Sequence, residues 1–378
     1  MMRKSNLQLF YNRILSLCFI LPAAVSAQNG GNNAYEFLNI PSSARTASLG
    51  GTLITLRDDD IHLVTENPAA LTAGVTNKAA LSYLNYFSDI YYGNLAYANS
   101  FKNKWRYYTG LRYLNYGDFY ATDIGGNVLN KFYAAEYSLD LGGSIDFDTL
   151  FFAGILVKTI YSQLETYWSI GQALDVGGVY ISQNRTFSGA VTVKNFGLQY
   201  KPYRGQNREF LPFEIQAGIS KKLKHSPFRF NLTLNHLETW NLTYDTPLDD
   251  YDSLFIQQDT IGEKTKTGKF LQKTTNTIVK GSDKTLRHLV IGTEILLTEN
   301  FHLRFGYNYR RRKEMIMDVK KGLSGFSAGF GLRINRFHLS YGLGIFFPGK
   351  ASHYFSLSTN ISDFRRKTAF PGNMDEYR

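Results

Sequence analysis

The sequence predicts an all-β fold, a 14-stranded antiparallel transmembrane β-barrel with an N-terminal hatch, or plug, inside it. Three observations lead to this prediction. Aromatic residues make up 15% of the 378 residues and charged residues only 19%, below the roughly 25% of a typical soluble domain. From residue 78 onward, apolar and polar residues alternate in a succession of short stretches. The gaps between these stretches alternate between short and long.

The first 27 residues predict a cleaved export signal. A basic front that ends at Arg13 precedes an apolar core at 14–25, and Ala27 completes the small-residue pattern of a signal-peptidase site. The only cysteine, Cys18, lies inside this signal, so the mature chain is expected to have no thiol and no disulfide. We therefore expect an exported protein that starts near Gln28.

Residues 28–77 are predicted to form a separate unit, because aromatic residues are fewer there and the alternation is absent. Small residues at 42–49, followed by Gly50 and Gly51, predict a short helix that ends at glycine. A ring of so many strands leaves a lumen wider than strand side chains alone can fill. We therefore expect this segment to lie in the barrel as the hatch.

The barrel strands are predicted from alternation with a period of two. In residues 301–311 the odd positions from Phe301 to Tyr309 are aromatic or apolar, whereas the even positions are polar or glycine. The same alternation recurs at 326–334 and 337–345. Counting such stretches places the strands of the barrel within 78–362, followed by a C-terminal tail at 363–378.

Alternation would also fit a soluble sandwich with one wet face, so the gap lengths decide between the two folds. Longer gaps fall at 116–130, 196–209, 238–284 and 312–321. Short turns at one end and long loops at the other are typical of outer-membrane barrels, with the loops outside the cell. A closed ring is also the β-structure that leaves no backbone group unpaired in lipid.

Four segments resemble the start of the PorV/PorQ set of outer-membrane barrels of the type IX secretion system, which are similar to the FadL fatty-acid channels. These segments are 35–45, 48–51, 58–60 and 67–71. Across the barrel, the resemblance depends on length, strand count and a turn at 194–197. It implies a FadL-like barrel in the outer membrane of a Gram-negative bacterium, with both termini in the periplasm. It also implies a PorZ-like soluble surface partner of the attachment complex, and no catalysis. The insert at 238–284 matches no element of that set.

Charged residues predict how the hatch is held. An arginine that faces lipid near the bilayer midplane costs roughly 2–4 kcal/mol, so the strand arginines are expected to point into the lumen. Hatch acids are then expected to pair with barrel arginines. The predicted hatch–barrel contact residues are Arg57, Asp58, Asp59, Asp60, Glu66, Arg106, Arg112, Arg229, Arg304 and Arg333.

Metal binding and catalysis were weighed against simpler explanations. The acids at 58–60 with His62 have no EF-hand spacing, and the seven histidines show no metal-ligand spacing. The segment 325–329 matches the nucleophile-elbow pattern, but Ser327 lies in the middle of a predicted strand rather than between a strand and a helix. We therefore expect no metal, no cofactor and no catalytic residue.

Two predicted outer loops mix cations with apolar residues, a composition found in protein interfaces. An equally simple explanation is that these loops contact outer-membrane lipid and anionic lipopolysaccharide. Export makes nucleic acid an unexpected partner. The predicted partner-binding residues are Lys201, Tyr203, Arg204, Arg208, Phe210, Arg311, Arg312, Lys313, Met315 and Met317.

Two functions remain open at this stage. The first is a plugged, non-catalytic barrel whose outer loops bind the soluble secretion partner. The alternative is a FadL-like channel for hydrophobic or small solutes. Both share one fold, so the fold cannot decide between them. A channel requires a path past the hatch, whereas a docking barrel requires a closed lumen and an adhesive rim.

Overall fold

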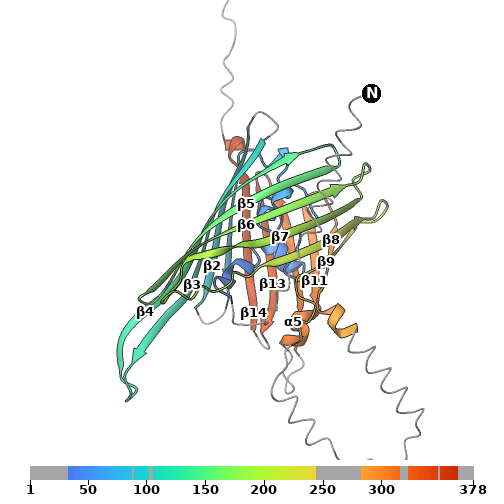
Figure 1. Ribbon diagram of the computed structural model, residues 1–378. Helices are drawn as coiled ribbons and strands as arrows, with labels where there is room; N and C mark the ends of the chain where they lie inside the picture. The colour runs from blue at the N-terminus through green and yellow to red at the C-terminus, as the bar shows by residue number, and fades with distance from the viewer. Residues whose placement is uncertain are drawn as a thin grey trace, which may run out of the picture. The chain divides into compact units, whose positions relative to one another are not determined.

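The computed structural model describes residues 33–86, 89–101, 105–243, 282–315, 322–347 and 350–364. In this part of the chain, 14 strands form a closed antiparallel barrel in which each strand pairs with its neighbours in sequence and β1 pairs with β14 (Figure 1). The predicted fold class is therefore confirmed. The predicted signal peptide, most of the 238–284 insert and the C-terminal tail from 365 lie outside the described residues.

The strands have the following bounds: β1 Lys78–Asn85, β2 Tyr91–Phe101, β3 Trp105–Thr122, β4 Val128–Asp146, β5 Phe151–Leu164, β6 Tyr167–Ile181, β7 Phe187–Lys201, β8 Glu214–Lys222, β9 Phe228–Leu234, β10 Leu289–Leu296, β11 Phe301–Asn308, β12 Phe326–Ile334, β13 Phe337–Phe347 and β14 Lys350–Asn360. Two short helices follow strands, α5 (Tyr309–Glu314) after β11 and η5 (Ile361–Phe364) after β14. No helix in the described residues is long and apolar enough to cross a bilayer.

The outward face of the barrel is apolar. On β5, Phe151 and Ile155 are more than half exposed, whereas Leu156 and Ile160 on the inward face are fully buried. Aromatic rings mark two levels on β3, with Trp105 near one end and Tyr113 eight residues further along. At about 3.3 Å per residue the two levels lie about 26 Å apart along the strand, before its tilt is counted. Outer-membrane barrels carry an apolar band of about 25 Å between two aromatic girdles.

One girdle can be followed from strand to strand through neighbouring rings. Tyr113 of β3 lies 5.9 Å from Tyr91 and 4.8 Å from Tyr137, measured between ring centroids. Tyr161 of β5 continues the row, 6.1 Å from Tyr137 and 6.3 Å from Trp168. Rings that are apolar in body and polar at the tip are favoured at the boundary between lipid and water.

The two ends of the barrel differ. The short-turn end carries the connections at 147–150, 182–186, 223–227, 297–300 and 335–336. The long-loop end carries 202–213 and the described segments 235–243 and 282–288. Strands β3 to β7 contain 14 to 19 residues each, whereas β8 to β11 contain 7 to 9. The wall is therefore tall along β3–β7 and low along β8–β11 (Figure 1).

Three predicted segments differ in the structure. The gap predicted at 116–130 is mostly strand, because β3 continues to Thr122 and β4 begins at Val128. The gap predicted at 196–209 is shorter, since β7 continues to Lys201. The strand predicted at 301–311 ends at Asn308, whose side chain accepts a hydrogen bond from the Arg311 N–H and so caps α5.

The hatch, described here as residues 33–77, consists of short helical turns. They are η1 (Glu36–Asn39), α2 (Ala44–Ser48), η2 (Ile61–Thr65), η3 (Pro68–Ala70) and η4 (Ala73–Val75). Each turn after η1 starts at a residue whose side chain accepts a backbone N–H, and these residues are Ser43, Asp60, Asn67 and Thr72. Such short turns have little intrinsic stability, so contacts with the barrel must hold them.

Glycines on the barrel wall let the hatch backbone approach closely. A Cβ built at Gly342 of β13 would lie 2.3 Å from the Ala44 carbonyl oxygen, and one built at Gly306 of β11 would lie 2.1 Å from the Gly50 nitrogen. Atoms cannot remain at such separations, so a larger side chain there would displace the hatch. Helix α2 therefore lies directly against the β11–β13 wall.

We predict that Gly342→Ala loosens the hatch while the barrel stays closed. Overpacking of this kind costs about 1–3 kcal/mol. The matched control is Gly178→Ala on β6, where a Cβ would lie 3.9 Å from the nearest atom. Limited trypsin digestion should cut after Arg45 and Arg57 faster in Gly342→Ala than in the wild type or the control. Equal cutting in all three proteins would contradict the close contact.

Candidate functional site

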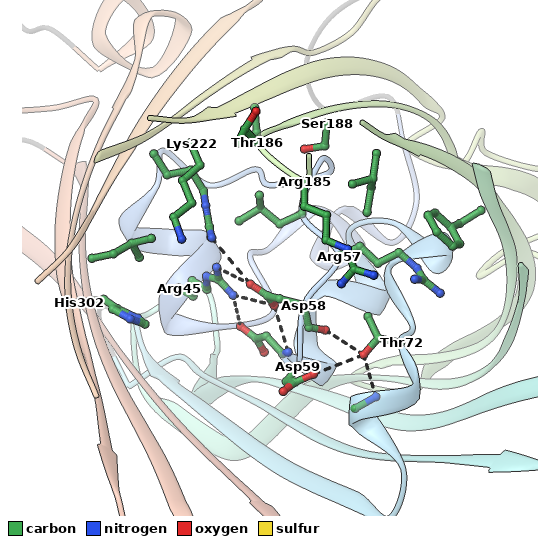
Figure 2. A pocket seen from close by; sticks show the side chains of 18 of the residues that line it. Arg45, Arg57, Asp58, Asp59, Thr72, Arg185, Thr186, Ser188, Lys222 and His302 are labelled. Atoms are coloured by element: carbon green, nitrogen blue, oxygen red, sulfur yellow. Dashed lines mark hydrogen bonds and ion pairs between the residues drawn. The ribbon is translucent and has the colours of Figure 1, made fainter. Parts of the chain in front are cut away.

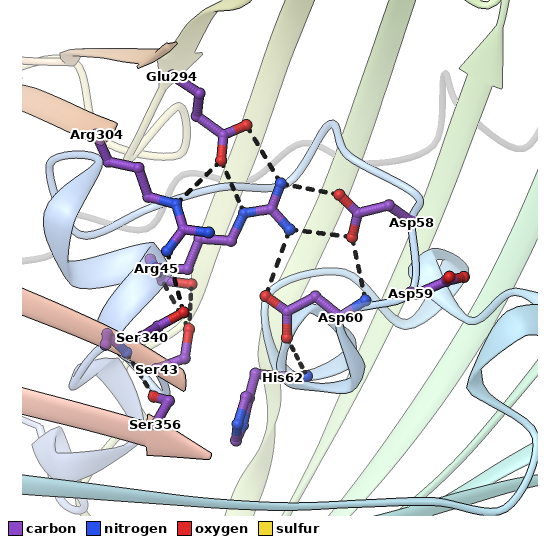
Figure 3. A network of polar contacts seen from close by, with 12 residues as sticks. Ser43, Arg45, Asp58, Asp59, Asp60, His62, Glu294, Arg304, Ser340 and Ser356 are labelled. Atoms are coloured by element: carbon purple, nitrogen blue, oxygen red, sulfur yellow. Dashed lines mark hydrogen bonds and ion pairs between the residues drawn. The ribbon is translucent and has the colours of Figure 1, made fainter. Parts of the chain in front are cut away.

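A buried carboxylate on the barrel wall binds three arginines, one of them from the hatch. Glu294 of β10 is fully buried. Its carboxylate lies 2.9 Å from Arg45 Nε, 2.9 Å from Arg229 Nη1 and 3.3 Å from Arg304 Nε. Helix α2 supplies Arg45 and β11 supplies Arg304, and Figure 3 shows both beside Glu294. Strand β9 supplies Arg229. We call Glu294 and these three arginines the Glu294 cluster.

Two hatch acids complete the charge balance of the Glu294 cluster. Arg45 Nη2 lies 2.8 Å from Asp58 Oδ2, and Arg45 Nη1 lies 3.4 Å from Asp60 Oδ2. Burial by itself would raise the pKa of Asp58, but the neighbouring Arg45 guanidinium holds that pKa below its usual value. Three guanidinium groups are thus balanced by three carboxylates, and Arg45 joins the hatch to the wall.

A second anchor lies at a bulge in β7. The pairing of β6 with β7 shifts between Leu174 and Val176, and Asn195 takes a positive φ of 58°. Its N–H donates to Asp175 Oδ1 over 2.7 Å, and Lys158 Nζ donates to its side-chain oxygen over 2.7 Å. The segment 194–197, predicted as a turn, is therefore a bulge within a strand.

The hatch contacts this bulge through an ion pair. Glu66 Oε2 lies 3.2 Å from Lys194 Nζ, and both side chains are almost fully buried. Asn39 accepts a hydrogen bond of 3.2 Å from the Asn195 amide. The bulge thus turns two polar side chains toward the hatch where regular alternation would supply one.

A third anchor lies at the short-turn end. Asp146, the last residue of β4, accepts Arg57 Nη2 of the hatch over 2.7 Å and Arg106 Nη1 of β3 over 2.5 Å. The hatch carbonyl oxygens of Ala69 and Leu71 accept the remaining contacts of Arg57, over 3.1 and 2.8 Å. Arg57 therefore connects the hatch to the rim of the barrel.

Several predicted hatch–barrel residues lie elsewhere than expected. Arg112 pairs with Asp140 of the barrel at 2.8 Å, and donates to the hatch only at the Leu38 carbonyl, over 3.4 Å. Asp59 faces Thr72 within the hatch. Arg333 is exposed on β12 rather than buried against the hatch.

The expectation that the hatch supplies the acids and the barrel supplies the arginines is met only in part. Among the predicted hatch acids, Asp58 approaches a barrel arginine, Arg229, at 3.9 Å. Glu66 pairs with a barrel lysine, Lys194, at 3.2 Å. The other short pairs run from the hatch arginines Arg45 and Arg57 to the barrel acids Glu294 and Asp146. The residues missed from the sequence are Arg45, Asp146, Lys194 and Glu294. Applying the inward-facing rule to acids as well as arginines would have found Glu294.

Ser327 takes part in holding the hatch. Its Oγ donates to the Ser48 carbonyl oxygen over 3.0 Å and accepts the Gly50 N–H over 3.0 Å. The hydroxyl is thereby engaged with the α2 terminus. Within the described residues, no group of three or more His, Cys, Asp or Glu side chains is placed to hold a metal ion.

A cavity of about 1470 Å³ lies between the hatch and the short-turn end. Its walls carry the arginines of the Glu294 cluster on one side and Arg57 with Arg106 on another. The turn residues Ser182, Gln183, Arg185 and Thr186 border it as well, as does Lys222 of β8. Figure 2 shows Arg185, Thr186 and Lys222 around this space. We call this space the vestibule. Its lining combines charged side chains with apolar ones such as Leu56, Phe152 and Ile181. Water or polar groups of a ligand fit best beside the charged side chains.

Toward the long-loop end, the interior is apolar and packed. Tyr35, Phe37 and Leu38 of the hatch belong to a buried cluster with barrel residues, which include Tyr92 and Tyr354. The Tyr35 hydroxyl lies 2.5 Å from Ser169 Oγ of β6. The hatch therefore presents apolar side chains to one end of the lumen and charged side chains to the other.

The predicted partner-binding residues differ in how far they are available at the surface. Tyr203 and Arg311 point inward, since the Tyr203 hydroxyl donates to Ser162 over 2.6 Å and Arg311 donates to the Gly50 carbonyl oxygen over 3.3 Å. Lys201 lies over the Trp168 ring and Arg204 over the Tyr167 ring. Arg312 donates to the Gly322 carbonyl oxygen, and Met315 is half-buried. Arg208, Phe210 and Lys313 are exposed, and Met317 lies outside the described residues.

Solved structures share this fold. The Pseudomonas putida toluene transporter TodX matches 84% of this chain and 98% of its own, with 12% identity and a TM-score of 0.51. The Ralstonia pickettii toluene transporter TbuX matches 86% of this chain and 99% of its own, with 7% identity and a TM-score of 0.50. No known protein family and no curated protein matches the sequence.

The protein is therefore a closed barrel with the fold of solved transporter barrels. At these identities the likeness concerns the fold alone. The comparisons agree with the closed-barrel architecture expected from the sequence. They do not support the narrower assignment to the PorV/PorQ set.

We predict that Glu294→Gln destabilises the protein by about 3 kcal/mol, because removing one member of a buried ion-pair group leaves the others uncompensated. Urea unfolding in detergent, followed by tryptophan fluorescence, measures the loss. The control is Asp118→Asn, which breaks an exposed pair with Lys131 and should change little. If Glu294→Gln were as stable as the control Asp118→Asn, the Glu294 cluster would not be what holds the hatch.

Proposed function

We propose that this protein is an outer-membrane channel for small or hydrophobic solutes and that the hatch is its gate. The supporting observation is the vestibule, a large cavity that ends at the hatch inside a barrel with the fold of toluene transporters. The outer membrane suits the closed ring of strands, the apolar outward face and the aromatic girdles. We place the short-turn end and both termini in the periplasm.

The packing of the interior indicates what must move for a solute to pass. The apolar cluster around Tyr35 and Phe37 lies between the long-loop end and the vestibule. A solute that enters from the long-loop end therefore has to displace hatch side chains. A hydrophobic solute would meet matching apolar groups there, whereas a strongly hydrated one would lose water on entry.

A disulfide tests whether the hatch must move. The hydroxyls of Thr55 in the hatch and Ser220 in β8 are in direct contact. The variant Thr55→Cys with Ser220→Cys should form a disulfide on oxidation, because the only other cysteine, Cys18, belongs to the predicted signal. Uptake of radiolabelled toluene into proteoliposomes should fall to the protein-free rate after oxidation and recover after reduction.

Thr55→Cys alone, treated with the same oxidant, is the matched control and should transport like the wild type. Equal uptake by the oxidised and reduced double variant would show that the hatch does not gate the path. Uptake by the wild type at the protein-free rate would reject the channel for this solute.

A second candidate function is the docking of a PorZ-like soluble partner in type IX secretion, and one observation favours it. Residues 117–133 extend β3 and β4 beyond their last pairs with β2 and β5, at Asn115 and Ala134 (Figure 1). We call this hairpin the arm. Ile124 is fully exposed, and Leu129 is 66% exposed. Unpaired strand edges with exposed apolar side chains are typical of protein-binding surfaces.

Under this second function, we expect a soluble protein to co-purify in fixed ratio with the barrel from native outer membranes. Ile124→Ser with Leu129→Ser should abolish that co-purification, because the arm would lose its apolar contact area. Leu223→Ser, at an exposed leucine of the short-turn end, is the matched control. A barrel that purifies alone, or a partner that is retained by the arm variant, would contradict docking through the arm.

A further inference from the structure

The cations of the vestibule are unevenly neutralised. The three arginines of the Glu294 cluster face three carboxylates, which are those of Glu294, Asp58 and Asp60. On the other wall, Arg57 and Arg106 share the single carboxylate of Asp146. Arg185 and Lys222 border the same cavity, and neither forms an ion pair within the described part of the chain. In the described residues these two cations are therefore not paired with a carboxylate, and Lys222 lies opposite Arg229 in the pairing of β8 with β9.

The shared carboxylate of Asp146 is engaged by two arginines. Arg106 binds both oxygens of Asp146, and Arg57 binds one of them. Burial, together with the positive charges of Arg106 and Arg185, lowers the pKa of Arg57 to about 10 against the opposing effect of Asp146. Arg185 thus lies close enough to act on Arg57, and among the residues that the structure describes it forms no ion pair with a carboxylate.

The turn at 182–186 aims Arg185 into the vestibule. Arg185 has a positive φ of 52°, and the Asn184 side chain accepts hydrogen bonds from the Thr186 N–H and hydroxyl over 3.1 and 2.8 Å. This local network fixes the turn. Figure 2 shows Arg185 beside Arg57, with Ser188 and Lys222 bordering the same space.

Three other acids line the vestibule and add negative charge to it, but none of them forms an ion pair with Arg185 or Lys222 in the described residues. Asp148 accepts the N–H of its neighbour Thr149 over 2.6 Å, and Asp59 accepts the hydroxyl of Thr72 over 3.5 Å. Glu299 lies in the turn between β10 and β11. No ion pair joins any of these three acids to an arginine of the vestibule in the described residues.

We propose that Arg57, Arg185 and Lys222 form a binding site for an anionic group, a phosphate or a carboxylate, carried by a small organic solute at the short-turn mouth of the barrel. Guanidinium groups bind such oxygens through short, charge-assisted hydrogen bonds. The Ser188 hydroxyl borders the same space and supplies a further donor. The cavity of about 1470 Å³ exceeds the roughly 300–1,000 Å³ of common ligand pockets, so it holds a solute together with water.

This site is independent of the proposed gating, because the vestibule exists with the hatch in place. A protein that binds anions but does not transport toluene would keep this inference and reject the channel. A protein that transports toluene but binds no anion would do the opposite.

Isothermal titration calorimetry of the purified full-length protein, in an uncharged detergent at low salt, tests the site. The probes are inorganic phosphate and citrate, with glycerol as the uncharged probe. We expect saturable binding of phosphate or citrate and none of glycerol, and the tighter of the two anions identifies the preferred group. Arg185→Gln should weaken binding by about tenfold or more, the usual loss for a charged hydrogen bond.

Arg333→Gln is the matched control, because Arg333 is exposed near the same end of the barrel but does not line the vestibule. It should bind like the wild type. Lys222→Gln is the second variant and should weaken binding as well. Thermal unfolding should show unchanged stability in all three variants. Absence of saturable binding, or equal weakening by Arg333→Gln and Arg185→Gln, would overturn the proposal.

Discussion

A closed ring of strands leaves no free edge within the ring itself, and that closure creates a wide interior that the strands alone cannot fill. The hatch fills it, and its position depends on the buried contact between Arg45 and Glu294. Arg45 is the one residue of that contact that belongs to the hatch, and its guanidinium also gathers Asp58 and Asp60. The charged half of the lumen is organised around this guanidinium.

Buried ion pairs of this kind specify position more than they stabilise. Removing two charges from water costs several kcal/mol per ion, and good pairing geometry is needed to offset that cost. The hatch is therefore held in one place by a few directional pairs at three separate points, Glu294, Lys194 and Asp146. Glycines such as Gly342 allow the backbone approach that these pairs require.

The lumen is polarised along its axis. Apolar hatch side chains near Tyr35 pack toward the long-loop end, and charged side chains surround the vestibule at the short-turn end. The wall is polarised around its circumference as well, since it is tall along β3–β7 and low along β8–β11. Both asymmetries suit a protein whose two mouths meet different chemical surroundings.

The sequence by itself determined the strands, their facing and their number, because side chains on a strand alternate between lipid and lumen with a period of two. It also separated the hatch from the barrel, since the alternation is absent before Lys78. Only the tertiary structure decided which side chains pair with one another. Which acid meets Arg45, and that 194–197 is a bulge rather than a turn, depends on residues far apart in the chain that only ring closure brings together. Alternation shows that Glu294 points inward, but it carries no information about what lies opposite.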